Sequence, residues 1–184
     1  MALVESRFER FTLALISLPG IGRKTAQAVL QAEKNIPDSP DELIRVVMRT
    51  ASRRGKKLTV RDADIAFERA DQIIAESSEH GIQIICISDD YYPIQLREIN
   101  DPPIVLFARG DCGVLLQTDS VAIVGTRQPT DFGKKSAQRI ASRLAEENIA
   151  VVSGLAQGCD ANAHEGCIAS GGRTIGVLAH GLDM

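Results

Sequence analysis

The sequence predicts an α/β protein in which an all-helical part, residues 1–80, precedes a part with a mostly parallel sheet, residues 81–184. Throughout the first part, apolar residues recur at helical spacing. From "IQIICIS" onward, short runs rich in Ile and Val alternate with helical stretches and with Gly or Pro breaks. This alternation of strand and helix is typical of a parallel sheet covered by helices.

The first part is expected to hold four helices: one reaching Leu18, one over 23–34, one over about 41–53 and one from Thr59 onward. The fourth has the clearest limits, because Thr59 and Asp62 have the spacing of a capping box and Gly81 stands where a C-terminal cap belongs. Its helically spaced apolar residues are Ala63, Ala66, Ala70, Ile73 and Ile74. The helical domain should therefore end near His80.

Five apolar runs in the second part predict strands, at 82–87, 104–108, 121–124, 150–152 and 174–178. A helix over about 132–147 should join the third strand to the fourth. Its expected buried stripe is Ala137, Ile140, Ala141, Leu144 and Ala145. Because the strands are apolar throughout, the sheet is expected to be covered on both faces.

Composition excludes several classes of protein. Hydrophobic residues make up 44% of the chain and charged residues 24%, as in globular proteins, and a net charge of -3 excludes coating of nucleic acid by bulk charge. Any anion site must come from local clustering. The four cysteines lack CxxC pairing, which indicates a reduced, cytoplasmic protein. The apolar N-terminal stretch is too short and interrupted for a membrane span or a signal peptide.

Two loops of small residues follow the third and fourth predicted strands, "GTRQPTDFG" and "SGLAQGCDANAH". Ligands of open α/β sheets gather at the carboxyl ends of strands, so both loops should open on one edge. Gly125 permits close backbone approach, Thr126 offers a hydroxyl, and Arg127 supplies a forked donor for phosphate. Ser153, Gly154 and Gly158 repeat the pattern, which together predicts a phosphate-sized anion site.

Other readings of these loops stay open. Neither GxGxxG nor GxxxxGK[ST] occurs, so dinucleotide binding and ATP hydrolysis by those motifs have little support, and no cofactor is expected. By spacing alone, small residues after a buried strand serve helix packing as often as ligand binding. Asp160 and His164, four residues apart, are interpreted as a helix-capping and a structural residue rather than an acid-base pair. The spacing of Cys159, His164 and Cys167 does not favour zinc.

In the helical part, "LPGIGRKTAQAVL" has the form of a helix-hairpin-helix turn. Its Gly20, Gly22 and Lys24 could hold a phosphate, or the turn could be purely structural and its surface used for protein contact. Arg45, Arg49 and Arg53 are spaced to form a stripe on the next helix. Four cations continue it: Arg54, Lys56, Lys57 and Arg61. Such a face is usually only solvated, and a nucleic-acid surface is the second reading.

Four motifs, in order, resemble the DprA/Smf family, DNA processing protein A. They are "YYPIQLREINDPPIVLFARGD", "VAIVGTRQPTDFG", "VVSGLAQGCDANAHEG" and "GGRTIGVLAHGLD". The second is similar to the family's Val-Gly-[Ser/Thr]-Arg motif and the third to its Val-Ser-Gly-x-Ala-x-Gly-Ile-Asp-x-x-Ala-His motif. The resemblance covers about residues 80–184, and the helical front is consistent with the SAM-like or hairpin module that often precedes this fold.

The resemblance implies an extended Rossmann-like domain that binds single-stranded DNA and helps to load the RecA recombinase in natural transformation or recombination. It implies a binding protein rather than an enzyme. Gly125, Thr126 and Arg127 would hold backbone phosphates, with Ser153, Gly154, Ala156 and Arg173 beside them. The aromatic residues available for base stacking are Tyr91, Tyr92, Phe107 and Phe132. A nucleotide-binding sensor or nucleotide-processing enzyme on the same fold edge is the alternative.

Two departures from the family stand out. Cys159 replaces the usual Ile, and Cys167 a small apolar residue, which fits packed thiols. The chain stops at "GLDM", where the family continues through further strands and helices to which the resemblance assigns homodimer and RecA contacts. We therefore expect a fragment or a shortened relative, with an incomplete sheet that has an unpaired edge or an uncovered face.

Overall fold

The computed structural model describes residues 2–33, 35–50, 58–117 and 119–183. The chain divides into two compact units, Met1–Gly110 and Asp111–Met184. The first unit contains α1 (Ala2–Ser17), α2 (Arg23–Ala32), α3 (Pro40–Thr50), α4 (Val60–Glu79), β1 (Gln83–Cys86), α5 (Ile94–Arg97) and β2 (Val105–Ala108). The second contains the short 3-10 helix η1 (Cys112–Leu116), then β3 (Ser120–Ala122), α6 (Asp131–Glu146), β4 (Ala150–Ser153), α7 (Cys159–Ala169) and β5 (Thr174–Gly176).

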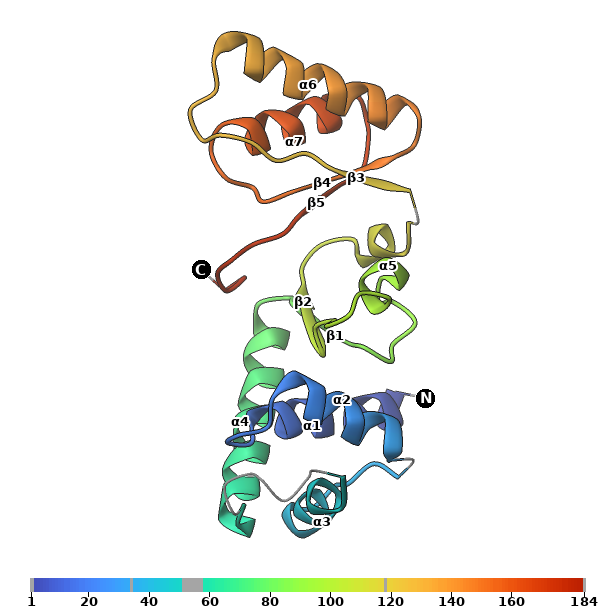
Figure 1. Cartoon of the computed structure of the whole chain (residues 1–184), viewed down its shortest axis with the longest axis vertical. Coiled ribbons are helices and arrows are strands. Elements are labelled where there is room, and N and C mark those ends of the chain that lie inside the picture. Colours follow the sequence, from blue (N-terminus) through green and yellow to red (C-terminus); the bar gives the residue numbers. More distant parts are fainter. Residues whose placement is uncertain (1, 34, 51–57, 118, 184) are drawn as a thin grey trace. The chain divides into compact units, whose positions relative to one another are not determined.

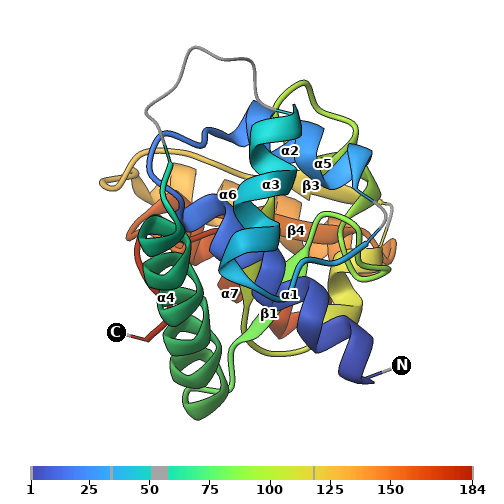
Figure 2. The same cartoon turned by 90° about the horizontal axis from the view of Figure 1, so that it is seen from below.

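The four predicted helices of the first part are present (Figure 1). Their apolar faces form one core. Phe11, Leu15, Leu43 and Phe67 are among its buried side chains. Figure 2 views this unit from below, with α3 lying across α1 and α4 along one side. No helix among the described residues is long and apolar enough to cross a membrane.

Both ends of α4 match the sequence prediction. The Asp62 amide donates to Thr59 Oγ1 at 3.2 Å and the Thr59 amide donates to Asp62 Oδ2 at 2.8 Å, so the capping box is confirmed. At the other end Gly81 has φ +64°, and the Gly81 and Ile82 amides donate to the carbonyls of Ser78 and Ser77. This pattern is a Schellman C-cap, in which the left-handed backbone conformation at Gly81 favours glycine.

The first two predicted strands do not join the parallel sheet. β1 and β2 pair antiparallel with each other, from Gln83 opposite Ala108 to Cys86 opposite Val105, and form a separate two-stranded sheet. This sheet packs on the helical core, to which Ile104 contributes a buried side chain. β1 and β2 thus belong to the first compact unit. The boundary at residues 80/81 between the helical domain and the Rossmann-like domain remains a prediction.

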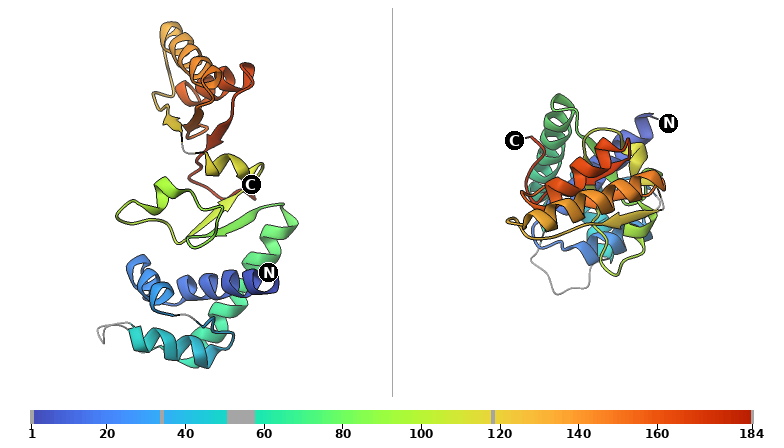
Figure 3. Two further views of the ribbon diagram at one scale, coloured as in Figure 1. Left: turned by 90° about the vertical axis from the view of Figure 1, so that its right-hand side faces the viewer. Right: turned by 90° about the horizontal axis from the view of Figure 1, so that it is seen from above.

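The other three predicted strands form a parallel sheet of order β3-β4-β5. The expectation of helices on both faces is wrong for the described residues of this unit, because α6 and α7 lie side by side over the same face (Figures 1 and 3). Strand order explains this. The chain steps across the sheet in one direction, and two right-handed crossovers in one direction place both helices on one side.

The contact between α6 and α7 is close. A Cβ atom on Gly166 would lie 2.4 Å from the Gln138 carbonyl oxygen, and Ser142 Oγ donates to the Gly166 carbonyl at 3.0 Å. Ala137 and Ala141 are buried as predicted, but Ile140 is 52% exposed. Ile140 lies at the margin of the buried face of α6, outside the contact that Gly166 makes with Gln138 and Ser142, so the prediction for Ile140 is wrong.

Candidate nucleic-acid interface

The loops that follow β3 and β4 lie together at the carboxyl edge of the parallel sheet, as their positions after parallel strands predict. The Cys159 amide, at the start of α7, donates to the Thr126 carbonyl at 3.0 Å. The Ile123 amide donates to the Val152 carbonyl at 2.9 Å, which extends the β3–β4 ladder toward the loops. Both helices begin at this edge, so their first N–H groups face it.

Two glycines make the loops fit against each other. A Cβ atom on Gly158 would lie 2.4 Å from the Thr126 carbonyl oxygen and 2.7 Å from Arg127 Cα, and Gly158 has φ +90°. A Cβ atom on Gly125 would lie 2.6 Å from the Cys159 side chain. At both positions an added side chain would collide with atoms of the other loop. The close packing of the two loops therefore requires glycine at each.

Arg127 and Thr126 present polar groups outward from this packed edge. Arg127 is exposed, and no carboxylate of the described residues lies within ion-pair distance of its guanidinium. Thr126 Oγ1 accepts from the Gln128 amide at 3.1 Å, which holds the turn and leaves the hydroxyl hydrogen available as a donor. An unpaired guanidinium beside a hydroxyl donor is suited to a phosphate.

Three other predicted residues have backbone or side-chain groups that form hydrogen bonds within the protein. Ser153 is only 3% exposed, and its hydroxyl donates to the Ile123 carbonyl at 2.5 Å. The Gly154 amide donates to Asp160 Oδ2 at 3.2 Å, and the Ala156 carbonyl accepts from the Ala161 amide at 3.1 Å. These groups are engaged within the protein, so they position the two loops.

Arg173 lies apart from these residues. It precedes β5, and its carbonyl accepts from the Val151 amide at 3.0 Å at the amino end of the strands. In a parallel sheet this end is opposite the carboxyl edge. The structure therefore does not bring Arg173 together with Arg127.

The helix-hairpin-helix turn has the expected backbone. Gly20 has φ +81°, and Gly22 begins α2 as an N-cap without a side-chain hydrogen bond. Gly20, Gly22 and Lys24 are exposed. Neighbouring positions of α2 hold the chain before β2, because Arg23 pairs with Asp101 at 2.6 Å and Gln27 Nε2 donates to the Pro102 carbonyl at 3.3 Å. The turn therefore has a structural role, and its exposed face is free for a second one.

The predicted basic stripe is only partly described. Arg45 and Arg49 are exposed on α3, where Arg45 Nε donates to the Asp41 carbonyl at 3.3 Å and Arg49 pairs with Glu33. Arg53 lies outside the described residues, as do Arg54, Lys56 and Lys57. The Glu33 carboxylate, at the C-terminal end of α2, therefore neutralises part of the positive charge of α3.

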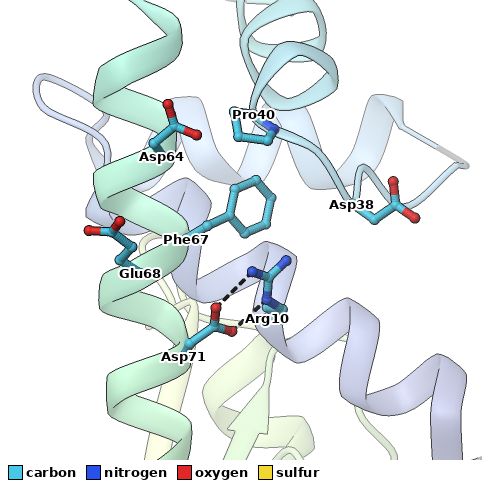
Figure 4. Close-up of a pocket in the computed structure, with 7 residues that line it drawn as sticks. All are labelled: Arg10, Asp38, Pro40, Asp64, Phe67, Glu68 and Asp71. Carbon is cyan, nitrogen blue, oxygen red and sulfur yellow. Dashed lines mark hydrogen bonds and ion pairs between the residues drawn. The ribbon is translucent and has the colours of Figure 1, made fainter.

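A recess of about 180 Å³ in the first unit has the opposite charge (Figure 4). Its acidic lining residues are Asp38, Asp64, Glu68 and Asp71. Arg10 reaches across to Asp71 with contacts of 2.5 and 2.7 Å and stacks 4.4 Å from the Phe67 ring centroid. The hydrogen bonds from Arg10 lower the pKa of the Asp71 carboxyl. With four carboxylates and one guanidinium, this recess disfavours a DNA phosphate.

Asp160 and His164 have structural partners. Asp160 Oδ2 holds the Gly154 amide of the preceding loop, a role that the sequence reading as a helix cap missed. His164 Nδ1 lies 2.6 Å from Thr174 Oγ1, which donates to the Val151 carbonyl, so we assign the proton to Nδ1. Burial lowers the pKa of His164, and the Asp160 charge opposes this shift. The described residues hold no group of three or more His, Cys, Asp or Glu placed to share a metal.

Comparison with known proteins identifies relatives of both units. The family model described as DNA recombination-mediator protein A matches residues 83–184. The chain is 40% identical over 116 residues to DNA processing protein DprA of Bacillus subtilis, covering 63% of this chain and 39% of that protein. It is 43% identical over 98 residues to DNA processing protein DprA of Streptococcus pneumoniae, covering 53% of this chain and 34% of that protein.

A solved structure is similar to nearly the whole chain. The X-ray structure of DNA processing protein A from Streptococcus pneumoniae aligns with a TM-score of 0.66 and 29% identity, over 97% of this chain and 59% of that one. The similarity includes the helical front as well as the residues that the family model matches. The matched part of the chain corresponds to about two fifths of the length of the Bacillus subtilis relative.

Proposed function

This chain belongs to the DNA recombination-mediator protein A family, and we propose on that premise that it binds single-stranded DNA at the carboxyl edge of β3 and β4. The observation that carries the proposal is the exposed Arg127 guanidinium, which has no carboxylate partner among the described residues and stands on a backbone fixed by Gly158. The held backbone places the guanidinium at this edge, and its planar fork of donors matches the oxygens of a phosphate.

In this proposal Arg127 and Thr126 contact backbone phosphates, and Gly125 lets the strand approach the main chain closely. Ser153, Gly154 and Ala156 act at one remove, because their polar groups hold the loops in place. Contacts to phosphate carry no sequence information, so binding is expected to be independent of base sequence. The role is binding rather than catalysis, which the structural engagement of Asp160 and His164 supports.

We infer that loading of RecA in natural transformation and homodimer formation involve parts of the longer family proteins beyond the 39% that this chain spans in the Bacillus subtilis relative. We propose that the protein works in the reducing cytoplasm, where its four cysteines would remain free thiols.

We propose a second DNA contact at the exposed helix-hairpin-helix turn and at the exposed arginines of α3. Gly20, Gly22 and Lys24 present a turn of the phosphate-binding form, and Arg45 and Arg49 are exposed. The variant Lys24→Ala should weaken DNA binding and reduce its salt dependence if the turn touches DNA. Unchanged binding would assign the turn to its structural role with Asp101 and Pro102.

The alternative function is binding or processing of a small nucleotide at the same edge. It is favoured by the position of the loops, since carboxyl ends of parallel strands are the usual nucleotide site of such sheets. The two functions differ in ligand size. A protein that binds a DNA strand gains affinity as the oligonucleotide becomes longer. A mononucleotide site is filled by a single nucleotide, so its affinity does not increase with length.

Competition between ligands tests the proposal. The chain is titrated into a fluorescein-labelled oligothymidylate and anisotropy is recorded, with unlabelled single strand, duplex and thymidine monophosphate as competitors. We expect the single strand to compete best, with affinity increasing with length, and the monophosphate to compete only at millimolar concentration. Equal competition by monophosphate and oligonucleotide would favour the nucleotide function and contradict ours.

A further inference from the structure

The outer face of α6 carries an aromatic residue that the sequence offers for base stacking, together with two cations that the DNA-binding prediction did not use. We define the α6 stripe as Phe132, Lys135 and Arg139, all exposed. At 3.6 residues per turn, positions separated by three and four residues fall within about 60° of one another around the helix axis. The stripe lies opposite the buried side of α6, which Ala137 and Ala141 occupy. Its members therefore face solvent together.

The two cations of the stripe are unpaired, in contrast to the next one along the helix. No carboxylate of the described residues lies within ion-pair distance of Lys135 or Arg139. Arg143 contacts Glu146 and Glu147, each at 2.8 Å. The positive charge available to an external anion thus begins in the first turns of α6 and ends before Arg143.

Phe132 adds an apolar surface to the same stripe. Its side chain is 79% exposed, and it is the sole aromatic residue of the sequence from 111 to 184. It lies in the first turn of α6, directly after the loop that carries Arg127, where Thr130 caps the helix by accepting from the Gly133 amide at 3.2 Å. An exposed aromatic ring beside cations is the usual platform for a base of a single strand.

The geometry points to a path for the DNA. We propose that the strand held by Arg127 continues along the α6 stripe, with a base stacked on Phe132 and following phosphates contacted by Lys135 and Arg139. The proposal rests on the single-strand binding proposed above. It gives the bound strand a direction, from the loop edge toward the C-terminal end of α6. The path ends before Arg143, because that side chain is paired with Glu146 and Glu147. Lys135 and Arg139 are about 6 Å apart along the axis.

Three variants of the whole chain separate these contributions: Lys135→Ala with Arg139→Ala, Phe132→Ala, and the control Arg143→Ala on the same helix. All four side chains are exposed, so the variants should keep the melting temperature of the parent chain. Affinity is measured by anisotropy at several salt concentrations with oligothymidylates of about 4 to 16 nucleotides, the range of site sizes of single-strand binders.

For the longer oligonucleotides, the double variant should reduce the slope of log affinity against log salt by about 1.4, since each phosphate contact contributes about 0.7. Phe132→Ala should weaken binding about 5- to 150-fold without changing the slope, as expected for loss of one stacked base. Arg143→Ala should change neither quantity. The loss in the double variant should disappear for oligonucleotides too short to pass the loop edge.

The outcomes distinguish this inference from the proposed function. If the parent chain binds the longer strands and Arg127→Ala weakens that binding, but the double variant and Phe132→Ala behave like the parent, the α6 path is wrong and the proposed function stands. If the folded parent chain binds no single strand at any length, both are overturned.

Discussion

Gly158 lies directly against the backbone of Arg127: a Cβ atom added at Gly158 would be 2.7 Å from Arg127 Cα and 2.4 Å from the Thr126 carbonyl oxygen. The loop after β4 therefore supports the loop after β3 at the residue proposed to hold DNA. The hydrogen bond from the Cys159 amide to the Thr126 carbonyl, 3.0 Å long, reinforces this support. The position of Arg127 thus depends on a residue distant in sequence.

Gly158→Ala should weaken single-stranded DNA binding and lower stability together. The matched control is Gly171→Ala, because Gly171 also has a positive φ, +70°, but a Cβ atom there would meet nothing within 4 Å. Both variants should lose about 1–3 kcal/mol from backbone strain, and only Gly158→Ala should also displace Arg127. Circular dichroism melting and anisotropy measure the two effects. Equal DNA affinity for the two variants would show that Arg127 does not depend on Gly158.

The cysteines should differ in reactivity, and DNA should protect one of them. Cys159 is half-buried at the proposed DNA edge, whereas Cys86, Cys112 and Cys167 are buried. Burial, with a smaller effect of Asp89, raises the pKa of the Cys86 thiol to about 12, so Cys86 should react last. Mass spectrometry after iodoacetamide treatment should find Cys159 labelled first and labelled more slowly with saturating single-stranded DNA. Labelling of Cys159 at an unchanged rate would place the strand elsewhere.

The second unit should become less stable as the pH falls below the ordinary imidazole pKa of about 6.5. Burial lowers the folded-state pKa of His164, so between the folded and unfolded values the unfolded chain binds more protons and stability rises with pH. Protonation would place an N–H at the buried Nε2, which has no hydrogen-bond partner among the described residues. The protection of amides in β4 and β5, taken as their hydrogen-exchange rate relative to the intrinsic rate at each pH, should therefore be lower at pH 5 than at pH 7.

A pair of variants identifies the titrating group. His164→Gln should remove this pH dependence, while His180→Gln, at an exposed histidine of the same unit, should retain it. Persistence of the effect in His164→Gln would assign it to another group.

Local rules gave the elements, and tertiary packing decided the rest. The Thr59–Asp62 capping box and the Gly81 cap depend on residues within a few positions, and both are confirmed. The prediction that Ile140 is buried is wrong, because burial on α6 depends on where α7 contacts it. Gly166, which is distant in the sequence, makes that contact. The antiparallel pairing of β1 and β2 could not be predicted for a related reason, since apolar runs do not encode strand direction.

The candidate site likewise has features that a general rule predicts and features that depend on tertiary packing. Adjacency of the Gly125–Arg127 and Gly158 loops followed from the rule that parallel strands end at one edge. The same rule, applied to Arg173, would have placed it at the amino end of its strand. The inward direction of Ser153 required the structure, because its hydroxyl is used by the Ile123 carbonyl.

The central claim is that Arg127 holds a phosphate of single-stranded DNA, and the salt dependence of binding tests it most directly. Parent chain and Arg127→Ala are titrated side by side against one labelled oligothymidylate at several salt concentrations, with Arg143→Ala as the control. We predict weaker binding by Arg127→Ala and a slope of log affinity against log salt reduced by about 0.7, one phosphate contact of a single strand. The same affinity and slope in all three proteins would contradict the claim.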